Sequence, residues 1–363
     1  MKKILLSAII CFIAIMNCNY VEAKEYTKGN FLYEYKMQKE GVWITRITPL
    51  SSKGIATLKI PKRLGGRKVV KLGGIVEDGD NETDLFGVRI PEEVSQYHPV
   101  NIYKRVLKIK TIRIPSTVKI ITENCFMFVP DGKNINIPKG VVENVLYFTN
   151  IKWNKLTISP KNKKYKIVDG CLLSKDGKIF YDMVKKRKKL IIPKEVRQIS
   201  SIAKYDGVKT IVIPKGVNQI DEFALSSQKA VTVKISKENK RYVVKDGSVY
   251  SKVTGRLVTG YVKNGVLKVP NQVKSIGKNG CLGPQPRTII IPESVTNIFS
   301  LLYMTEEDKL TCVCKGKTPP KLNGECFGWV KNLILYVPKN CKSKYQEQWK
   351  FSPNVKVTII EQG

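Results

Sequence analysis

The sequence is poor in histidine and in acidic side chains. His98 is the single histidine among 363 residues, and 30 Asp and Glu stand against 64 Lys and Arg. A Ser-His-Asp or Cys-His arrangement would have to include His98, which lies in the irregular stretch 97–105, where a surface loop is the simpler interpretation. The chain also lacks a phosphate-binding glycine loop, a His-Glu-x-x-His motif and a nucleophile elbow. We therefore expect no enzyme and no cofactor, although the paired carboxylates of a glycosidase can meet from any two positions.

Long apolar runs are confined to the N-terminus. Residues 2–3 are lysines, residues 4–16 are apolar, and Ala23 offers a small side chain for cleavage. This order is typical of a secretory signal, and the apolar run is too short to span a membrane. We expect residues 1–23 to be a signal peptide and the mature chain to be secreted or attached to a cell surface, with no transmembrane segment. Cys18 leaves lipid attachment as an alternative.

Negative charge is scarce enough to make the chain strongly basic, with a formal net charge of +34. Such a protein attracts polyanions, among them nucleic acid, anionic wall polymers and sulfated glycans. A high isoelectric point can also serve solubility alone. The charge therefore indicates a class of partners without selecting one.

A short phrase of the form apolar–x–apolar–proline recurs along the chain. Full copies occupy residues 58–61, 88–91, 112–115, 135–138, 190–193, 211–214, 267–270 and 289–292, and weaker copies occupy 156–158, 233–235, 310–312 and 335–338. Neighbouring copies are mostly 21 to 25 residues apart, with one gap of 30 and two of 34. Each copy predicts a short strand that its proline ends. One such unit cannot bury its apolar side alone, so the sequence predicts a β-rich solenoid of about twelve turns with short parallel strands.

The two gaps of 34 residues hold inserts that resemble each other. Asp169-Gly170 and Asp246-Gly247 lie between alternating apolar residues, 77 residues apart. Asp-Gly in that setting is a strong signal for a two-residue turn. Each insert is predicted to be a β-hairpin.

The stretch 112–126 reads Ile-x-Ile-Pro-x-x-Val-x-x-Ile-x-x-x-Cys-Phe. It resembles the BspA-like, or treponemal, class of leucine-rich repeats, which occurs in surface and secreted proteins of bacteria and some protists. The resemblance extends over about residues 28–358. It implies an N-terminal β cap at 24–57, a leucine-rich-repeat solenoid at 58–317 and a closing repeat with a C-terminal cap at 318–363. Because the chain shows no catalytic motif, we expect adhesin-like binding of protein or glycan ligands at a cell surface, without catalysis.

The middle residue of each strand is expected to face outward, and these residues should form one row. The candidate ligand surface consists of Lys59, Arg89, Arg113, Ile191, Val212, Lys234, Lys268 and Tyr336. Asn136, Thr157, Ile290 and Thr311 belong to the same predicted row. The alternative is that strand-forming residues occupy these positions for their β propensity alone.

A second candidate surface is basic. It consists of Lys161, Lys163, Lys164, Lys185, Lys186, Arg187, Lys188 and Lys189. Successive cations repel unless they are solvated or countered, so this patch could bind wall polymer, sulfated glycan or extracellular DNA, or could be a solvated turn. No tryptophan interleaves with the run, which argues against specific nucleic-acid recognition.

Seven of the nine cysteines lie outside the predicted signal. Cys125, Cys281 and Cys326 occupy the small core position of the repeat, which favours packing over chemistry. Two alternatives remain, a metal site that combines Cys326 with the Cys-x-Cys sequence 312–314 and a disulfide between 314 and 341. We expect no metal.

Overall fold

The computed structural model describes residues 23–73, 76–77, 81–82, 85–86, 100–122, 125–126, 131–142, 153–185, 187–202, 207–227, 229–277, 281–299, 309–324, 326–327 and 330–362. The chain forms two compact units, residues 1–163 and 164–363. Residues 1–22 of the predicted signal peptide lie outside the described ranges, and the cap and solenoid boundaries expected from the sequence remain predictions. Within the described ranges no helix is both long and apolar enough to cross a membrane.

The first unit begins with a mixed sheet. Its strands are β1 (Lys24–Lys28), β2 (Phe31–Gln38), β3 (Gly41–Pro49), β5 (Arg63–Leu64), β6 (Arg67–Leu72) and β10 (Ile120–Ile121). β1, β2 and β3 pair antiparallel, whereas β6 adds to β3, and β10 to β6, in parallel. Alternate side chains of β2, namely Phe31, Tyr33 and Tyr35, are buried, as a sheet with one covered face requires.

The repeat strands of the first unit form a parallel sheet. They are β4 (Thr57–Lys59), β9 (Thr111–Arg113), β11 (Asn134–Ile137) and β12 (Lys155–Ile158). Ile112 lies opposite Ile135 in the adjacent strand and both are buried, which is what the repeat spacing predicts. The unit also contains the hairpin β7 (Val76–Glu77) and β8 (Asn81–Glu82) and the helix α3 (Val100–Lys108). α3 begins within the stretch 97–105, which departs from the repeat pattern of the sequence.

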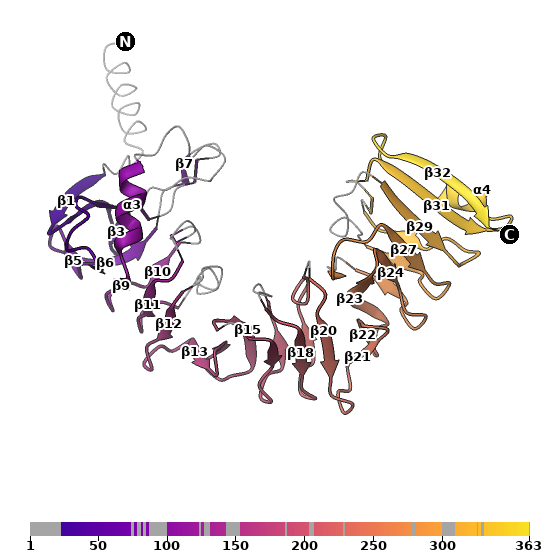
Figure 1. Cartoon of the computed structure of the whole chain (residues 1–363), viewed down its shortest axis with the longest axis horizontal. Helices are drawn as coiled ribbons and strands as arrows, with labels where there is room; N and C mark the ends of the chain where they lie inside the picture. The colour runs from indigo at the N-terminus through magenta and orange to yellow at the C-terminus, as the bar shows by residue number, and fades with distance from the viewer. Residues whose placement is uncertain are drawn as a thin grey trace, which may run out of the picture. The chain divides into compact units, whose positions relative to one another are not determined.

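The repeat strands of the second unit form two parallel groups, whose members lie side by side in Figure 1. The first group is β16 (Lys189–Ile191), β18 (Thr210–Ile213) and β20 (Thr232–Ile235). The second is β24 (Val266–Lys268), β27 (Thr288–Ile291), β29 (Lys309–Cys314), β31 (Asn332–Pro338) and β32 (Lys356–Gln362). Within each group, the first residues of successive strands are about one repeat length apart in the sequence.

The second unit also contains a set of very short parallel strands, the returning strands, which lie in the second half of the repeats. It comprises β17 (Gln198–Ile199), β19 (Gln219–Ile220), β25 (Ser275–Ile276), β28 (Asn297–Ile298) and β30 (Lys321–Leu322). Val273 and Ile276 of one repeat, and Val295 and Ile298 of the next, are all buried. The Val-x-x-Ile arm of the sequence therefore supplies the second side of each turn.

These parallel strands make the fold a β-solenoid of about 11 turns with little helix. The fold class predicted from the sequence is confirmed. β4 pairs directly with β9, with Lys59 opposite Arg113, and the repeat copy at 88–91 lies outside the described ranges.

Both inserts form the predicted hairpins and each gains a third strand. The first consists of β13 (Tyr165–Val168), β14 (Cys171–Ser174) and β15 (Ile179–Met183), and the second of β21 (Tyr242–Lys245), β22 (Ser248–Ser251) and β23 (Arg256–Lys263). Both residues of each Asp-Gly turn have positive φ, as a two-residue hairpin of this type demands. β15 pairs in parallel with the returning strand β17, and β23 pairs in parallel with β25. β23 also pairs with β26 (Cys281–Leu282).

Aromatic side chains close the C-terminal end of the core. The helix α4 (Lys342–Gln348) places Tyr345 against Trp349, with ring centroids 5.3 Å apart, and Trp349 also contacts Phe327. Tyr345 Oη donates to the carbonyl of Gly316 at 2.8 Å, and Trp349 Nε1 to that of Pro320 at 2.7 Å. These buried rings thus satisfy their polar atoms while they cover the end of the core.

Candidate functional site

The outward face of β24, β27, β29, β31 and β32 carries two rows of side chains in register. One row runs through Thr288, Thr311, Ile334 and Thr358, and the other begins at Lys268. Backbone pairing places Lys268 opposite Ile290, then Val313, Tyr336 and Ile360 in successive strands. Each of these residues is at least partly exposed, and Ile360 is 38% exposed. The row that begins at Lys268 is therefore apolar from β27 to β32, which is unusual for a surface that faces water on one side.

The register corrects the sequence-based row at β29. Ile290 lies opposite Val313, whereas Thr311 lies opposite Thr288, so Val313, and not Thr311, continues the row that contains Ile290. β29 alternates apolar residues over its whole length, so the sequence pattern allowed two frames and only backbone pairing distinguishes them. Ile360 was missed because no proline ends β32 in the way that marks the other repeat strands.

A shorter row occupies the outward face of β16, β18 and β20. Ile191 lies opposite Val212, which lies opposite Lys234. Ile191 is 55% exposed and Lys234 is exposed, whereas Val212 is partly covered. The second insertion separates β20 from β24 along the chain, and these two strands do not pair with each other.

The first unit holds the remaining members of the predicted row. Lys59 lies opposite Arg113, and the row continues through Asn136 to Thr157. Asn136 Nδ2 donates to Thr157 Oγ1 at 2.7 Å. Arg89 lies outside the described residues. This part of the predicted surface is polar and basic.

The basic run at 185–189 is partly a structural element. Arg187 is half-buried and its Nη2 donates to the carbonyl of Asp169, so its guanidinium closes the turn of the first insertion. Lys185, Lys188 and Lys189 are exposed. Lys186 lies outside the described residues.

The upstream lysines of the predicted basic patch are divided between the two units. Lys161 and Lys163 belong to the first unit and Lys164 to the second. All three are exposed, and Lys164 Nζ lies 5.8 Å from the centroid of the Tyr165 ring.

The described cysteines are buried thiols, which is what the packing interpretation expects. They are Cys125, Cys171, Cys312, Cys314, Cys326 and Cys341. The hydrogen bond with Cys314, together with burial, raises the pKa of the Cys312 thiol well above its usual range, and burial raises that of Cys326 to about 11. Such thiols are poor nucleophiles at neutral pH.

The two remaining candidates from the sequence are a metal site and a catalytic histidine. Among the described residues no three His, Cys, Asp or Glu side chains are grouped so that they could hold a metal ion. His98 lies outside those residues, as does the side chain of Cys281.

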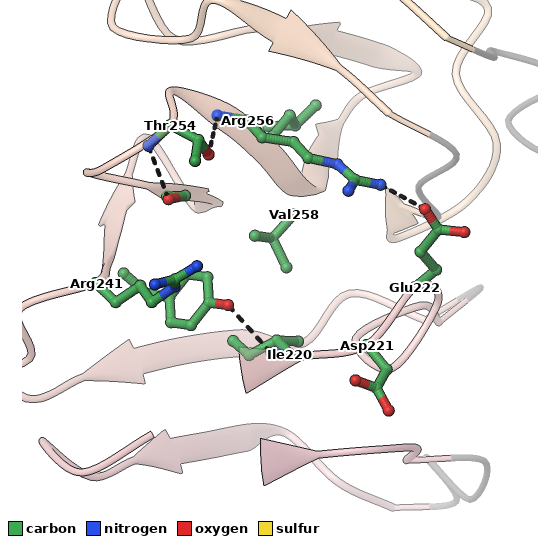
Figure 2. Close-up of a pocket in the computed structure, with 10 residues that line it drawn as sticks. Ile220, Asp221, Glu222, Arg241, Thr254, Arg256 and Val258 are labelled. Atoms are coloured by element: carbon green, nitrogen blue, oxygen red, sulfur yellow. Dashed lines mark hydrogen bonds and ion pairs between the residues drawn. The ribbon is translucent and has the colours of Figure 1, made fainter. Parts of the chain in front are cut away.

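One cavity of about 180 Å³ lies beside the second insertion, and sequence reasoning did not find it. It is lined by Ile220, Asp221, Glu222, Arg241, Tyr242, Ser251, Thr254, Arg256, Leu257 and Val258. Figure 2 shows Val258 pointing into the space between Arg256, Arg241 and Ile220. The lining comes from the turn after β19, the hairpin β21–β22 and the start of β23, so no local motif could reveal it.

Charged groups of both signs surround this cavity. Arg256 Nη2 donates to Glu222 Oε1 at 2.5 Å, and both side chains remain about half exposed. Asp221 accepts hydrogen bonds from the side-chain amides of Gln198 and Gln219 at 2.8 to 3.0 Å. The arrangement suits a small polar ligand and contains no nucleophile–base pair.

The comparisons with known proteins agree with the repeat architecture. The sequence profile of the BspA type leucine-rich repeat region matches six copies, over residues 81–173 and 174–247. No curated protein matches the chain.

Three solved structures resemble this one over most of its length. A leucine-rich cell surface protein of Faecalibacterium prausnitzii is 14% identical with a TM-score of 0.39, over 94% of this chain and 96% of its own. The pneumococcal vaccine antigen PcpA is 13% identical with a TM-score of 0.33, over 93% and 99%. A leucine-rich repeat protein of Eubacterium ventriosum is 14% identical with a TM-score of 0.31, over 94% and 85%.

The family profile and the backbone agree on the same repeats. The matched copies include β9, β11, β12, β16, β18 and β20, whose strands pair in parallel with the repeat anchors in register. Residues 81–247 therefore match repeats of the BspA type leucine-rich repeat region.

Proposed function

We propose that this chain is a secreted or cell-surface binding protein that recognises a protein partner through the outward face of β24–β32, in the manner of an adhesin. The observation that carries the proposal is the in-register apolar row Ile290, Val313, Tyr336 and Ile360. Exposed apolar rows that a fold does not need for its own core mark interaction surfaces. Tyrosine within such a row is favoured because it adds apolar area and a polar end at low entropic cost.

The proposed location rests on the N-terminal sequence. Lysines at 2–3 precede the apolar run 4–16 and the small residue Ala23. For an exported protein, the available partners of such a face are other cells or their extracellular matrix.

A paired substitution tests the face. The chain from residue 24 is bound to a panel of purified extracellular-matrix and surface proteins, with and without Tyr336→Ser and Ile360→Ser together. We expect the affinity for a protein that binds the unmodified chain to fall at least tenfold, and to change little between 50 and 500 mM salt, because apolar contacts dominate. Val253→Ser is the matched control, since Val253 is 66% exposed in the turn between β22 and β23 and lies outside the row. Equal binding by the paired variant would refute the proposal.

Electrostatic binding of an anionic polymer is a second candidate function. It is favoured by the formal net charge of +34 and by the exposed side chains of Lys185, Lys188 and Lys189. Wall polymer, sulfated glycan and extracellular DNA share the required charge. Binding of this kind falls steeply with salt, which separates it from the first candidate.

A further inference from the structure

The two insertions are copies of one three-stranded structure, 77 residues apart. Tyr165 lies opposite Ser174 in the first, and Tyr242 lies opposite Ser251 in the second. The third strand joins with a register shift at the equivalent place in both copies, and it pairs with the returning strand in the same register. The copies can therefore be compared residue by residue.

The copies differ where the cavity opens. In the first, Tyr181 packs edge-on against Tyr165, with ring centroids 5.5 Å apart. Val258 stands at the position of Tyr181 in the second copy and lines the cavity together with Tyr242. The cavity occupies the space that an aromatic ring at position 258 would fill. The two copies therefore share a backbone and differ here in their side chains.

Two arginines accompany the loss of the ring. Arg256 stands where the first copy has Ile179, and Arg241 where it has Lys164. The guanidinium of Arg256 bonds to Glu222 and lies over Gly277, where a Cβ would come within 2.6 Å of Nε. Arg241 is exposed and makes no ion pair with any described residue. One guanidinium is thus fixed in place and the other is available for an anion.

The remaining polar atoms suit hydroxyl groups. Asp221 Oδ2 accepts one hydrogen bond, from Gln198, and has capacity for another. The hydroxyls of Ser251 and Thr254 each accept from a backbone N–H, which leaves each with a proton to donate. A ligand hydroxyl can use these acceptor and donor positions.

We propose that this cavity binds a single acidic sugar residue of the hexuronate type. The carboxylate of the sugar bonds to Arg241 and Arg256, its hydroxyls bond to Asp221 and Thr254, and one ring face rests on Val258. The volume of about 180 Å³ is below the roughly 300–1,000 Å³ of pockets for drug-sized ligands, which limits the occupant to one ring. The cavity shares no residue with the apolar row, so its role is independent of the protein-binding face.

Ligand-observed NMR titration of D-glucuronate against the chain from residue 24 tests the proposal. We expect saturable binding in the millimolar range, as a single small ring allows. Glucose, which lacks the carboxylate, should bind at least tenfold more weakly. Val258→Tyr restores the ring that the first insertion carries at this place, so it should fold and abolish binding. Arg241→Gln should weaken binding at least tenfold.

Lys263→Gln is the matched control for charge, because Lys263 is an exposed cation of β23 that does not line the cavity. The affinity of the Lys263→Gln variant for glucuronate should stay within twofold of the affinity of the unmodified chain. Unchanged binding by Val258→Tyr would show that the cavity is not the site. Equal binding of glucose, or tighter binding of glutamate than of glucuronate, would overturn the ligand class. Circular dichroism of each variant confirms folding, and each variant should keep the protein partner of the apolar row.

Discussion

At the scale of single residues, Lys133 shows a basic side chain used as part of a core. It is 2% exposed, and its Nζ donates to the carbonyls of Val106 and Ile109 at 2.8 and 2.6 Å. These carbonyls lie at the C-terminal end of α3, where acceptors lack helical partners and a cation is favoured. Burial nevertheless lowers the pKa of Lys133 to about 8.

The lowered pKa of Lys133 predicts a stability that rises with pH. Between about pH 8 and 10.5 the folded amine is mostly neutral while the unfolded amine is still charged, so the unfolded state binds more protons and the free energy of unfolding increases. From pH 7 to pH 10 the unmodified chain should gain roughly 2–3 kcal/mol relative to Lys133→Met. Urea unfolding at both pH values measures this difference. Lys110→Met, at an exposed lysine of the same unit, should show the same gain in the free energy of unfolding between pH 7 and pH 10 as the unmodified chain. If Lys133→Met differs from the unmodified chain by the same free energy at both pH values, the lowered pKa of Lys133 is refuted.

At the scale of elements, the turn between β21 and β22 and the turn between β23 and β24 differ in the side chains that pack next to them. Gly247 and Gly265 both follow a residue of positive φ in a two-residue turn and have φ of +79° and +75°. A Cβ on Gly247 would lie 2.6 Å from the ring of Tyr261, whereas a Cβ on Gly265 would meet nothing nearer than 3.9 Å. The hairpin at Gly247 is therefore held by close packing as well as by turn geometry.

These two glycines form a matched pair of substitutions. Gly265→Ala should cost about 1 kcal/mol, the penalty of a left-handed conformation alone. Gly247→Ala should cost about 2–4 kcal/mol, because Tyr261 must also move. Urea unfolding of the two variants gives the comparison directly. An equal loss of unfolding free energy in the two variants would mean that the Tyr261 ring moves aside without an energetic cost.

At the scale of the whole molecule, the excess of 64 basic over 30 acidic residues sets how the chain meets polyanions. Retention on heparin should fall steeply with salt. Substitution of Lys185, Lys188 and Lys189 by serine should lower the eluting salt by the same modest amount as substitution of Lys110, Lys119 and Lys139, since each change reduces the formal charge from +34 to +31. A selective loss for the first set would instead favour a discrete polyanion site. Arg187 is left in place because it closes a turn.

The sequence by itself determined the repeat, the parallel strands and both hairpin inserts. A strand ended by proline, a Val-x-x-Ile arm and an Asp-Gly turn each depend on local backbone rules, so a single chain is enough to predict them. The packing role of the cysteines also follows from their place in the repeat. The apolar row was only partly predictable, because the five-residue alternation of β29 allows two frames and β32 has no closing proline.

Only the tertiary structure decided which side chains meet. Lys133 looks like any other lysine in the sequence, and the burial and carbonyl partners that change its chemistry come from a helix more than twenty residues away. Arg187 belongs to a basic run but serves a turn eighteen residues upstream. The cavity beside the second insertion joins three segments, and its opening depends on Val258 standing where the first copy has Tyr181. Repeats encode their own backbone locally, whereas a site depends on the few positions at which otherwise equivalent copies differ.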